Sequence, residues 1–262
     1  YKVERDYPGR AGTSRISPYL TVGAVSTRQC VHAALSAAGL EAKGLDVKGH
    51  ERMPAGPGHW VSEVVWREFF THVLVGWPRV CMGRAFQIHT ERLRWSENEE
   101  HFRAWCEGRT GVPIVDAGMR ELLATGWMHN RVRMITAMFL TKNLFIDWRR
   151  GERFFMRNLV DGFLASNNGG WQWSASTGTD AAPYFRIFNP ISQSEKFDPE
   201  GSYIRRWVEE LRDVEGPAVH QPHDERKGLP GMLRMKIEYP EPIVDLSASR
   251  ERAIAAFQAL RA

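Results

Sequence analysis

The chain has 262 residues, which is enough for one large domain or two small ones. Its apolar content of 43% and charged content of 25% are ordinary for a globular protein, and it contains no run of about 18 apolar residues that would predict a membrane span. The net charge of +4 permits an anionic partner without requiring one, and three widely spaced cysteines exclude a CxxC metal site and favour a reducing compartment such as the cytoplasm.

Helical patterns follow one another along the chain, and no alternating strand pattern is found, so the predicted fold class is all-α. Residues 26–39 predict a helix that begins after the cap Ser26 and stops at Gly39. Residues 40–58, rich in Gly, Pro and charge, predict a loop or linker. The other predicted helices cover residues 59–76, 112–126, 129–145, 152–162, 203–214 and 249–262, with an irregular stretch at 216–231.

The stretch GTSRISPYL, residues 12–20, predicts a helix start with Ser17 as N-cap and Pro18 in the first turn. A helix N-terminus beside hydroxyl groups and Arg15 can bind a phosphate. An ordinary capped helix is the commoner explanation of the same pattern.

One face of the helix predicted at 59–76 mixes charge with aromatic rings. Glu63, Trp66, Arg67 and Phe70 stand at i, i+3, i+4 and i+7, beside an apolar stripe. A buried ion pair under aromatic cover would explain this pattern, and a ligand pocket would explain it equally well.

In the helix predicted at 129–145, Asn130, Arg133 and Met134 share a face. Buried polar groups need partners, and Asp161 is a candidate partner for Arg133. Arginines interleaved with aromatic residues suit nucleic acid, although a solvated basic face is the default.

The stretch LASNNGGWQWSAS, residues 164–176, combines turn-forming Asn and Gly with two tryptophans. It fits a flat, polar-edged ligand lying against the backbone. A glycine turn capped by core tryptophans fits as well, and on this stretch alone the turn is favoured.

Taken together, five segments closely resemble the photolyase/cryptochrome family, and most nearly its class I cyclobutane pyrimidine dimer photolyases. They are GTSRISPYL, WREFF, GRTGVPIVDAGMRELLATGWMHNRVRM, NNGGWQWSASTGTDAAPYFRIFNP and EKFDPEG. The resemblance runs from Tyr1 to about Val214 and continues more faintly to the end. It implies that residues 1–262 form one all-helical FAD-binding catalytic domain, without the family's N-terminal α/β antenna domain, whose chromophore stays unspecified. The chain opens without Met, as expected of a fragment.

The resemblance implies non-covalent FAD and assigns residues to three groups. Those toward FAD would be Tyr1, Thr13, Ser14, Arg15, Ile16, Ser17, Trp60, Arg67, Trp127, Asn130, Arg133, Asp161, Gly162, Phe163 and Asn167. Those toward the flipped dimer and the DNA would be Arg5, Glu63, Trp66, Asn130, Arg131, Met134, Trp173 and Gln193. The catalytic set would be Glu63, Asn167 facing the flavin, and the electron-transfer tryptophans Trp171, Trp148 and Trp95.

The activity implied is light-driven repair of pyrimidine dimers in DNA by an electron from reduced FAD, in a monomer that binds no membrane. Relatives often carry DGD where this chain has DGF, so Phe163 replaces an acidic residue, and the 40–58 loop looks longer. Three cysteines cannot supply the four-cysteine iron–sulfur site of one cryptochrome branch. Two alternatives stay open: a cryptochrome-like photoreceptor without repair activity, and a flavin-free helical DNA-binding module.

Overall fold

The computed structural model describes residues 1–40, 53–224, 229–230, 232 and 237–260. Within these ranges the chain is helical and has no β-strand, only an isolated parallel bridge between Ser96 and Ile146, so the all-α prediction is confirmed. The α-helices described are α1 (Ser17–Thr21), α2 (Thr27–Ala37), α4 (Ala55–Gly76), α5 (Glu99–Glu107), α6 (Pro113–Thr125), α7 (Asn130–Met138), α8 (Trp148–Asn158), α9 (Leu164–Ala175), α10 (Pro190–Phe197), α11 (Ser202–Trp207) and α13 (Leu246–Gln258). Short helices of other types are η1 (Pro78–Met82), η2 (Ile88–Arg92), the π-helix η3 (Phe139–Asn143), η4 (Glu209–Leu211) and η5 (Gly216–His220).

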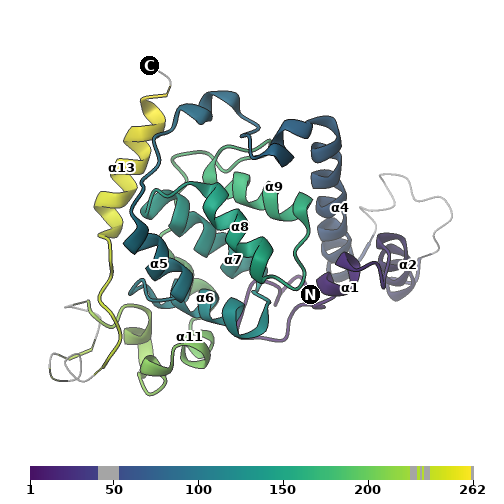
Figure 1. Cartoon of the computed structure of the whole chain (residues 1–262). Coiled ribbons are helices and arrows are strands. Elements are labelled where there is room, and N and C mark those ends of the chain that lie inside the picture. Colours follow the sequence, from purple (N-terminus) through teal and green to yellow (C-terminus); the bar gives the residue numbers. More distant parts are fainter. Residues whose placement is uncertain (41–52, 225–228, 231, 233–236, 261–262) are drawn as a thin grey trace.

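Helix α9 occupies the middle of the molecule, with α4 on one side and α7 and α8 on the other (Figure 1). Helix α2 packs on α4, and α13 packs on η3 at the far side of the bundle. The main core lies between α5, α6, α7, α8, α9 and α11, and α2 and α4 share a smaller cluster of their own. Its largest fully buried side chains include Trp105, Trp148, Trp171 and Tyr203.

Two glycines let α9 approach its neighbours closely. A Cβ on Gly169 of α9 would overlap the ring of Phe70 on α4, and a Cβ on Gly151 of α8 would overlap the indole of Trp171 on α9. Both contacts need the absence of a side chain, because interiors are packed without spare volume. Helix α9 is therefore fixed between α4 and α8.

Capping residues set several helix ends as predicted. The Ser26 hydroxyl accepts from the Gln29 amide, and the Gln29 side chain accepts from the Ser26 amide, which completes a capping box. Gly126 ends α6 in the left-handed conformation at φ 69°. Helices α5 and α10 were not predicted, although each begins after an asparagine cap, Asn98 and Asn189.

The predicted turn in residues 164–176 is wrong, because residues 164–175 form helix α9. Tertiary packing outweighs the weak helix preference of Asn and Gly here. Asn168 is buried, its amide donates to the Val80 carbonyl, and its oxygen accepts from Gln172 one turn later. The left-handed residue that ends the helix is Ser176, at φ 61°.

Other boundaries also differ from the prediction. The helix predicted at 152–162 is α8, which runs from Trp148 to Asn158. The predicted 40–58 loop is wrong at its end, because α4 already begins at Ala55, and residues 41–52 lie outside the described residues. The helix predicted at 129–145 widens into the π-helix η3, and the one predicted at 203–214 breaks after Trp207. In the stripe predicted on α4, Val61 and Val64 are buried but Val65 is exposed.

Candidate functional site

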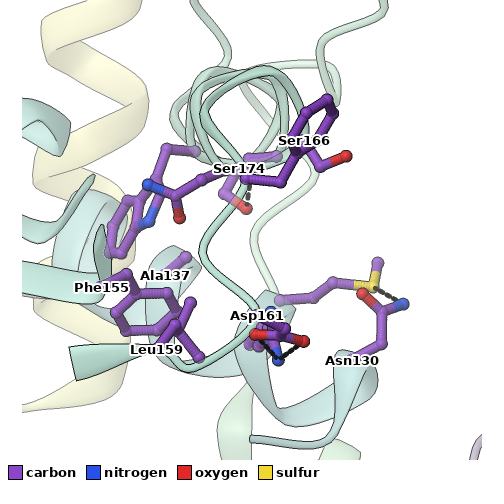
Figure 2. A pocket seen from close by; sticks show the side chains of 13 residues that line it. Asn130, Ala137, Phe155, Leu159, Asp161, Ser166 and Ser174 are labelled. Atoms are coloured by element: carbon purple, nitrogen blue, oxygen red, sulfur yellow. Dashed lines mark hydrogen bonds and ion pairs between the residues drawn. The ribbon is translucent and has the colours of Figure 1, made fainter. Parts of the chain in front are cut away.

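A cavity of about 140 Å³ opens between α7, α8 and α9 (Figure 2). Helices α7 and α9 contribute most of its wall, and the turn after α8 contributes its floor. The lining residues are Asn130, Arg133, Met134, Ala137, Phe155, Leu159, Asp161, Phe163, Ser166, Asn167, Gly170, Trp171 and Ser174.

A charge pair lies at the floor of this cavity. The Arg133 guanidinium donates through Nη2 to both carboxylate oxygens of Asp161, at 3.0 and 2.8 Å, and the Asp161 side chain is only 3% exposed. The predicted contact between Arg133 and Asp161 is confirmed. The Ser17 hydroxyl donates to the same carboxylate at 2.6 Å, so α1 is tied to this floor.

The prediction that Ser17 is the N-cap of α1 is wrong. Ser17 is the first helical residue, the cap position is Ile16, and no side chain caps this short helix. The Ser17 hydroxyl is directed to Asp161 instead, because a buried carboxylate is the stronger acceptor.

Residues 13–17 nevertheless contact Trp60 and Trp127, the two tryptophans that the resemblance assigns to the same FAD site. The Trp60 indole donates to the Ser14 hydroxyl at 3.1 Å, and the Arg15 guanidinium lies 4.5 Å above the Trp127 ring. Arg15 adopts φ 50°, an uncommon backbone conformation for a residue with a side chain. Thr13, Ile16 and Tyr1 are half-buried on the same segment of the chain.

Arg67 is a half-buried cation that makes no ion pair in the described part of the chain. Its guanidinium lies 3.6 Å above the Phe163 ring and donates to the Leu20 carbonyl at 3.4 Å. Burial lowers the pKa of Arg67, although Glu68 and Asp161 oppose this. Most of the Arg67 donors therefore have no acceptor among the described residues, and Phe163, whose ring the guanidinium covers, lines the cavity.

The three predicted electron-transfer tryptophans lie at different depths. Trp171 and Trp148 are buried at 2% and 1% exposure, and Trp95 is half-buried against the ring of Phe145. The Trp148 indole N–H is buried without a hydrogen-bond partner, and the Arg149 guanidinium lies 4.7 Å from its ring. Trp105 was missed by the sequence reasoning, although it is fully buried and 6.0 Å from the Trp171 ring centroid.

The residues predicted to meet a flipped base or DNA lie around and beyond the cavity. Asn130 and Met134 line it, with the Asn130 amide 4.0 Å from the Met134 sulfur. Trp66 is 43% exposed on α4 beside Phe69 and Phe70. Trp173 faces a second small hollow, and Gln193 on α10 is outside the cavity lining.

The two arginines predicted to lie along DNA are both held in ion pairs. Arg5 contacts Glu63 at 2.5 Å, and Arg131 contacts Asp6 at 2.7 Å. Arg131 also lies 4.4 Å from the ring of Phe197. A phosphate at either position would compete with a carboxylate of the same chain.

Several lining residues escaped sequence analysis. Phe155 and Leu159 have the spacing of ordinary core positions, so nothing separates them from core residues in the sequence. The lining positions of α9 repeat at i, i+4 and i+8, which would have shown a helix face had residues 164–175 been predicted as helical. These positions are Ser166, Gly170 and Ser174.

Comparison with known proteins identifies the domain. Residues 60–259 match the family model described as the FAD binding domain of DNA photolyase. The chain belongs to this family. Its photolyase-type domain is 51% identical to a deoxyribodipyrimidine photo-lyase of Escherichia coli K12 and 46% identical to one of Neurospora crassa, over 100% and 98% of the chain.

Solved structures agree with this assignment. A class III photolyase from Agrobacterium tumefaciens superposes over the whole chain with a TM-score of 0.86 and 42% identity. A cryptochrome from Synechocystis superposes over 98% of the chain with a TM-score of 0.83 and 33% identity. The chain covers 52% of the Escherichia coli relative, 42% of the Neurospora one, and 52% and 51% of the two solved chains.

FAD is the cofactor of this family, and the residues of the cavity fit it. The space in front of Gly170 is open, so a flat ring can approach the α9 backbone there. The guanidinium of Arg67, which has no ion pair in the described part of the chain, and the hydroxyls of Thr13 and Ser14 before α1 suit a diphosphate. In the described ranges there is no group of three or more metal-ligating side chains, and no helix is long and apolar enough to cross a membrane.

Proposed function

We propose that the protein containing this domain repairs cyclobutane pyrimidine dimers in DNA with light and reduced FAD. The observation that carries the proposal is the cavity between α7, α8 and α9. It combines a charge pair at its floor, the buried Trp171 in its wall, and Asn130 and Met134 in its lining. The similarity to deoxyribodipyrimidine photo-lyases over the whole chain supports it.

FAD would be held by residues from three parts of the chain: residues 13–17, helix α4 and helix α9. Bound in its reduced form, it would supply the light absorption and the electron that splits the dimer. Residues 13–16 and Arg67 would bind its phosphates, because hydroxyls and a guanidinium without an ion pair are good donors to anions. The Ser17 hydroxyl already donates to Asp161, so Ser17 would act by holding Asp161 at the cavity floor. Asn167, whose amide donates to the Glu152 carbonyl at 3.0 Å, is held at a fixed orientation beside the cavity and would face the flavin.

The dimer would enter the cavity out of the base stack, as photolyase substrates must to be reached. Trp66 would offer an aromatic surface, and Asn130 would offer an amide that can donate and accept. Arg131 and Gln193 would contact the DNA backbone. Affinity for DNA would then depend strongly on salt, because phosphate contacts release counterions.

The three tryptophans would return oxidised FAD to its reduced form. Trp171, Trp148 and Trp95 would carry an electron from the half-buried Trp95 inward to the cavity.

We also propose that the protein works as a monomer in the cytoplasm. Its cysteines Cys30, Cys81 and Cys106 are all free, as a reducing compartment requires. Elution of the complete gene product as a dimer in size-exclusion chromatography would contradict the monomer.

Repair is tested by illuminating the complete gene product, loaded with reduced FAD, in the presence of an oligonucleotide that contains a thymine dimer. Recovery of thymine absorbance is the expected result. If the thymine dimer persists in the oligonucleotide after illumination, the repair proposal is refuted and the photoreceptor alternative is favoured.

Two variants separate recognition of the dimer from general DNA affinity. Glu63→Ala should weaken binding of dimer-containing DNA by about 1–3 kcal/mol, the usual cost of an unsatisfied polar partner, and reduce repair per absorbed photon. Arg131→Ala should weaken damaged and undamaged duplex alike and lower the salt slope by about one. If the Glu63→Ala variant repaired dimers as efficiently as the parent protein, Glu63 would not be a residue that contacts the dimer.

A further inference from the structure

Helix α9 begins at the cavity with an apolar residue in its cap position. Phe163 occupies this position and lines the cavity, and Ser166 of the first turn lines it too (Figure 2). Phe163 has no side-chain atom that can accept from the first amides of α9, and no acidic residue stands in the first turn. The first N–H groups of a helix have no partner within the helix, and together they carry partial positive charge. The start of α9 therefore presents a positive potential beside the cavity.

The backbone at Phe163 already has the conformation of a capping residue. Its φ of −127° and ψ of 115° are the extended values that a cap adopts. An Asn or Asp side chain at this position can thus accept from the helix amides without a change of backbone. Photolyases that the chain resembles often carry an acidic residue here, whereas Phe163 supplies neither the acceptor nor the charge.

The charged side chains in the cavity lining compensate each other. They are Arg133 and Asp161, which form the ion pair at the floor. Glu152 of α8 is half-buried outside the lining, and burial raises the pKa of its carboxyl, which favours the neutral form. The lining therefore holds no additional carboxylate that would offset the positive potential at the start of α9.

Arg67 adds a cation next to Phe163. Its guanidinium lies 3.6 Å from the Phe163 ring and makes no ion pair in the part of the chain that the structure describes. Glu68, the neighbouring carboxylate that acts on Arg67, is exposed, so solvent weakens its effect. The face of an aromatic ring attracts a guanidinium without neutralising its charge. Phe163 therefore leaves this charge in place, where an acidic residue would compensate it.

We infer that Phe163 shifts the equilibrium between oxidised and reduced FAD in this cavity toward the reduced form. A flavin ring that has taken up two electrons and one proton carries one more negative charge than the oxidised ring, and nearby protein charges change the relative stability of the two forms. An uncapped helix start and a guanidinium without an ion pair both favour the more negative form. The inference deepens the proposed function and rests on it, because that function uses reduced FAD.

The test measures the midpoint potential of FAD bound to the complete gene product, by spectroelectrochemistry in the dark and without DNA. Phe163→Asp adds a cap and a charge, and Phe163→Asn adds a cap without the charge. Phe163→Leu is the matched control, because it adds neither and stays apolar. Circular dichroism and flavin absorbance verify that each variant is folded and loaded, and the dissociation constants of oxidised and reduced FAD are measured separately.

Phe163→Asp should lower the preference for reduced over oxidised FAD about tenfold, which lowers the midpoint of a two-electron couple by about 30 mV. Phe163→Asn should lower the preference by a smaller factor of about three, because its amide caps the helix without adding charge. Phe163→Leu should stay within about twofold of the parent. Each factor compares two redox forms on the same variant, so a general loss of FAD affinity does not produce it.

Two results would overturn the role of Phe163. One is an unchanged or higher preference for reduced FAD in Phe163→Asp. The other is an equal loss in Phe163→Leu and Phe163→Asp, because the lost ring would then be the cause, and not the added cap and charge. Failure of the proposed function is a separate result: illumination would leave thymine dimers intact in a parent protein whose midpoint still responds to Phe163→Asp.

Discussion

Asp161→Asn is the sharpest perturbation of the cavity floor, because it removes one charge and keeps the size of the side chain. The carboxylate is 3% exposed and accepts from Arg133 twice and from Ser17 once. Removing one partner of a buried, hydrogen-bonded charge pair costs about 3–5 kcal/mol. Arg133 is 24% exposed and keeps its bond to the Met128 carbonyl at 2.8 Å, so we expect about 2–3 kcal/mol.

For a domain of this size, that loss should lower the midpoint of thermal unfolding by about 4–12 °C. The measurement is thermal and urea unfolding of the complete gene product, with FAD and without it, because a loss of bound FAD would add to the effect. Glu99→Gln is the control, since it breaks the exposed Arg150–Glu99 pair and should leave the midpoint unchanged. A loss below about 0.5 kcal/mol in Asp161→Asn without FAD would show that the pair contributes no more than a surface salt bridge.

Three further predictions follow from the site. Arg67→Gln should weaken FAD binding about tenfold, measured by titration of flavin fluorescence, because it removes a cation that has no ion pair in the described part of the chain and is available to the phosphate; unchanged binding would contradict this. Trp148→Phe should preserve the fold and slow photoreduction of oxidised FAD in flash photolysis, and an unchanged rate would exclude Trp148 from the electron path. Burial lowers the pKa of His129 to about 4, and its ring nitrogen accepts from the Arg131 amide, so the unfolded chain binds the extra proton between about pH 4 and 6.5. Stability should therefore fall on acidification through this window by up to about 1.4 kcal/mol per pH unit in urea unfolding, and His129→Asn, which keeps a capping side chain, should flatten the profile; an identical profile would refute the role.

The sequence predicted those parts of the structure that depend on local chemistry. The cap Ser26 and the stop Gly126 act at the positions expected, because a capping hydroxyl and a left-handed glycine need only neighbouring backbone. The contact of Arg133 with Asp161 was also predictable, since a guanidinium in an apolar helix requires an acceptor.

The parts that failed depend on contacts between distant segments. Residues 164–175 became helical because Asn168 found Val80 and Gln172 as partners, which no local preference reveals. The Ser17 hydroxyl donates to Asp161, which is distant in the sequence, and does not cap α1, so this contact could not be predicted locally either. The roles assigned by resemblance to residues such as Asn167 and Gln193 stay predictions.

The close glycine contacts on either side of α9 bear on whether illumination could displace this helix. Gly169 lies against Phe70 and Gly151 lies against Trp171 so closely that a methyl group at either glycine would overlap the facing ring. A photoreceptor must convert a change at its chromophore into a displacement that another protein can sense. Electron transfer instead needs a helix that does not move, because the donor and the acceptor must keep a constant distance. In the proposed repair reaction, the close packing at these two glycines would keep Trp171 of α9 at a fixed distance from its neighbours.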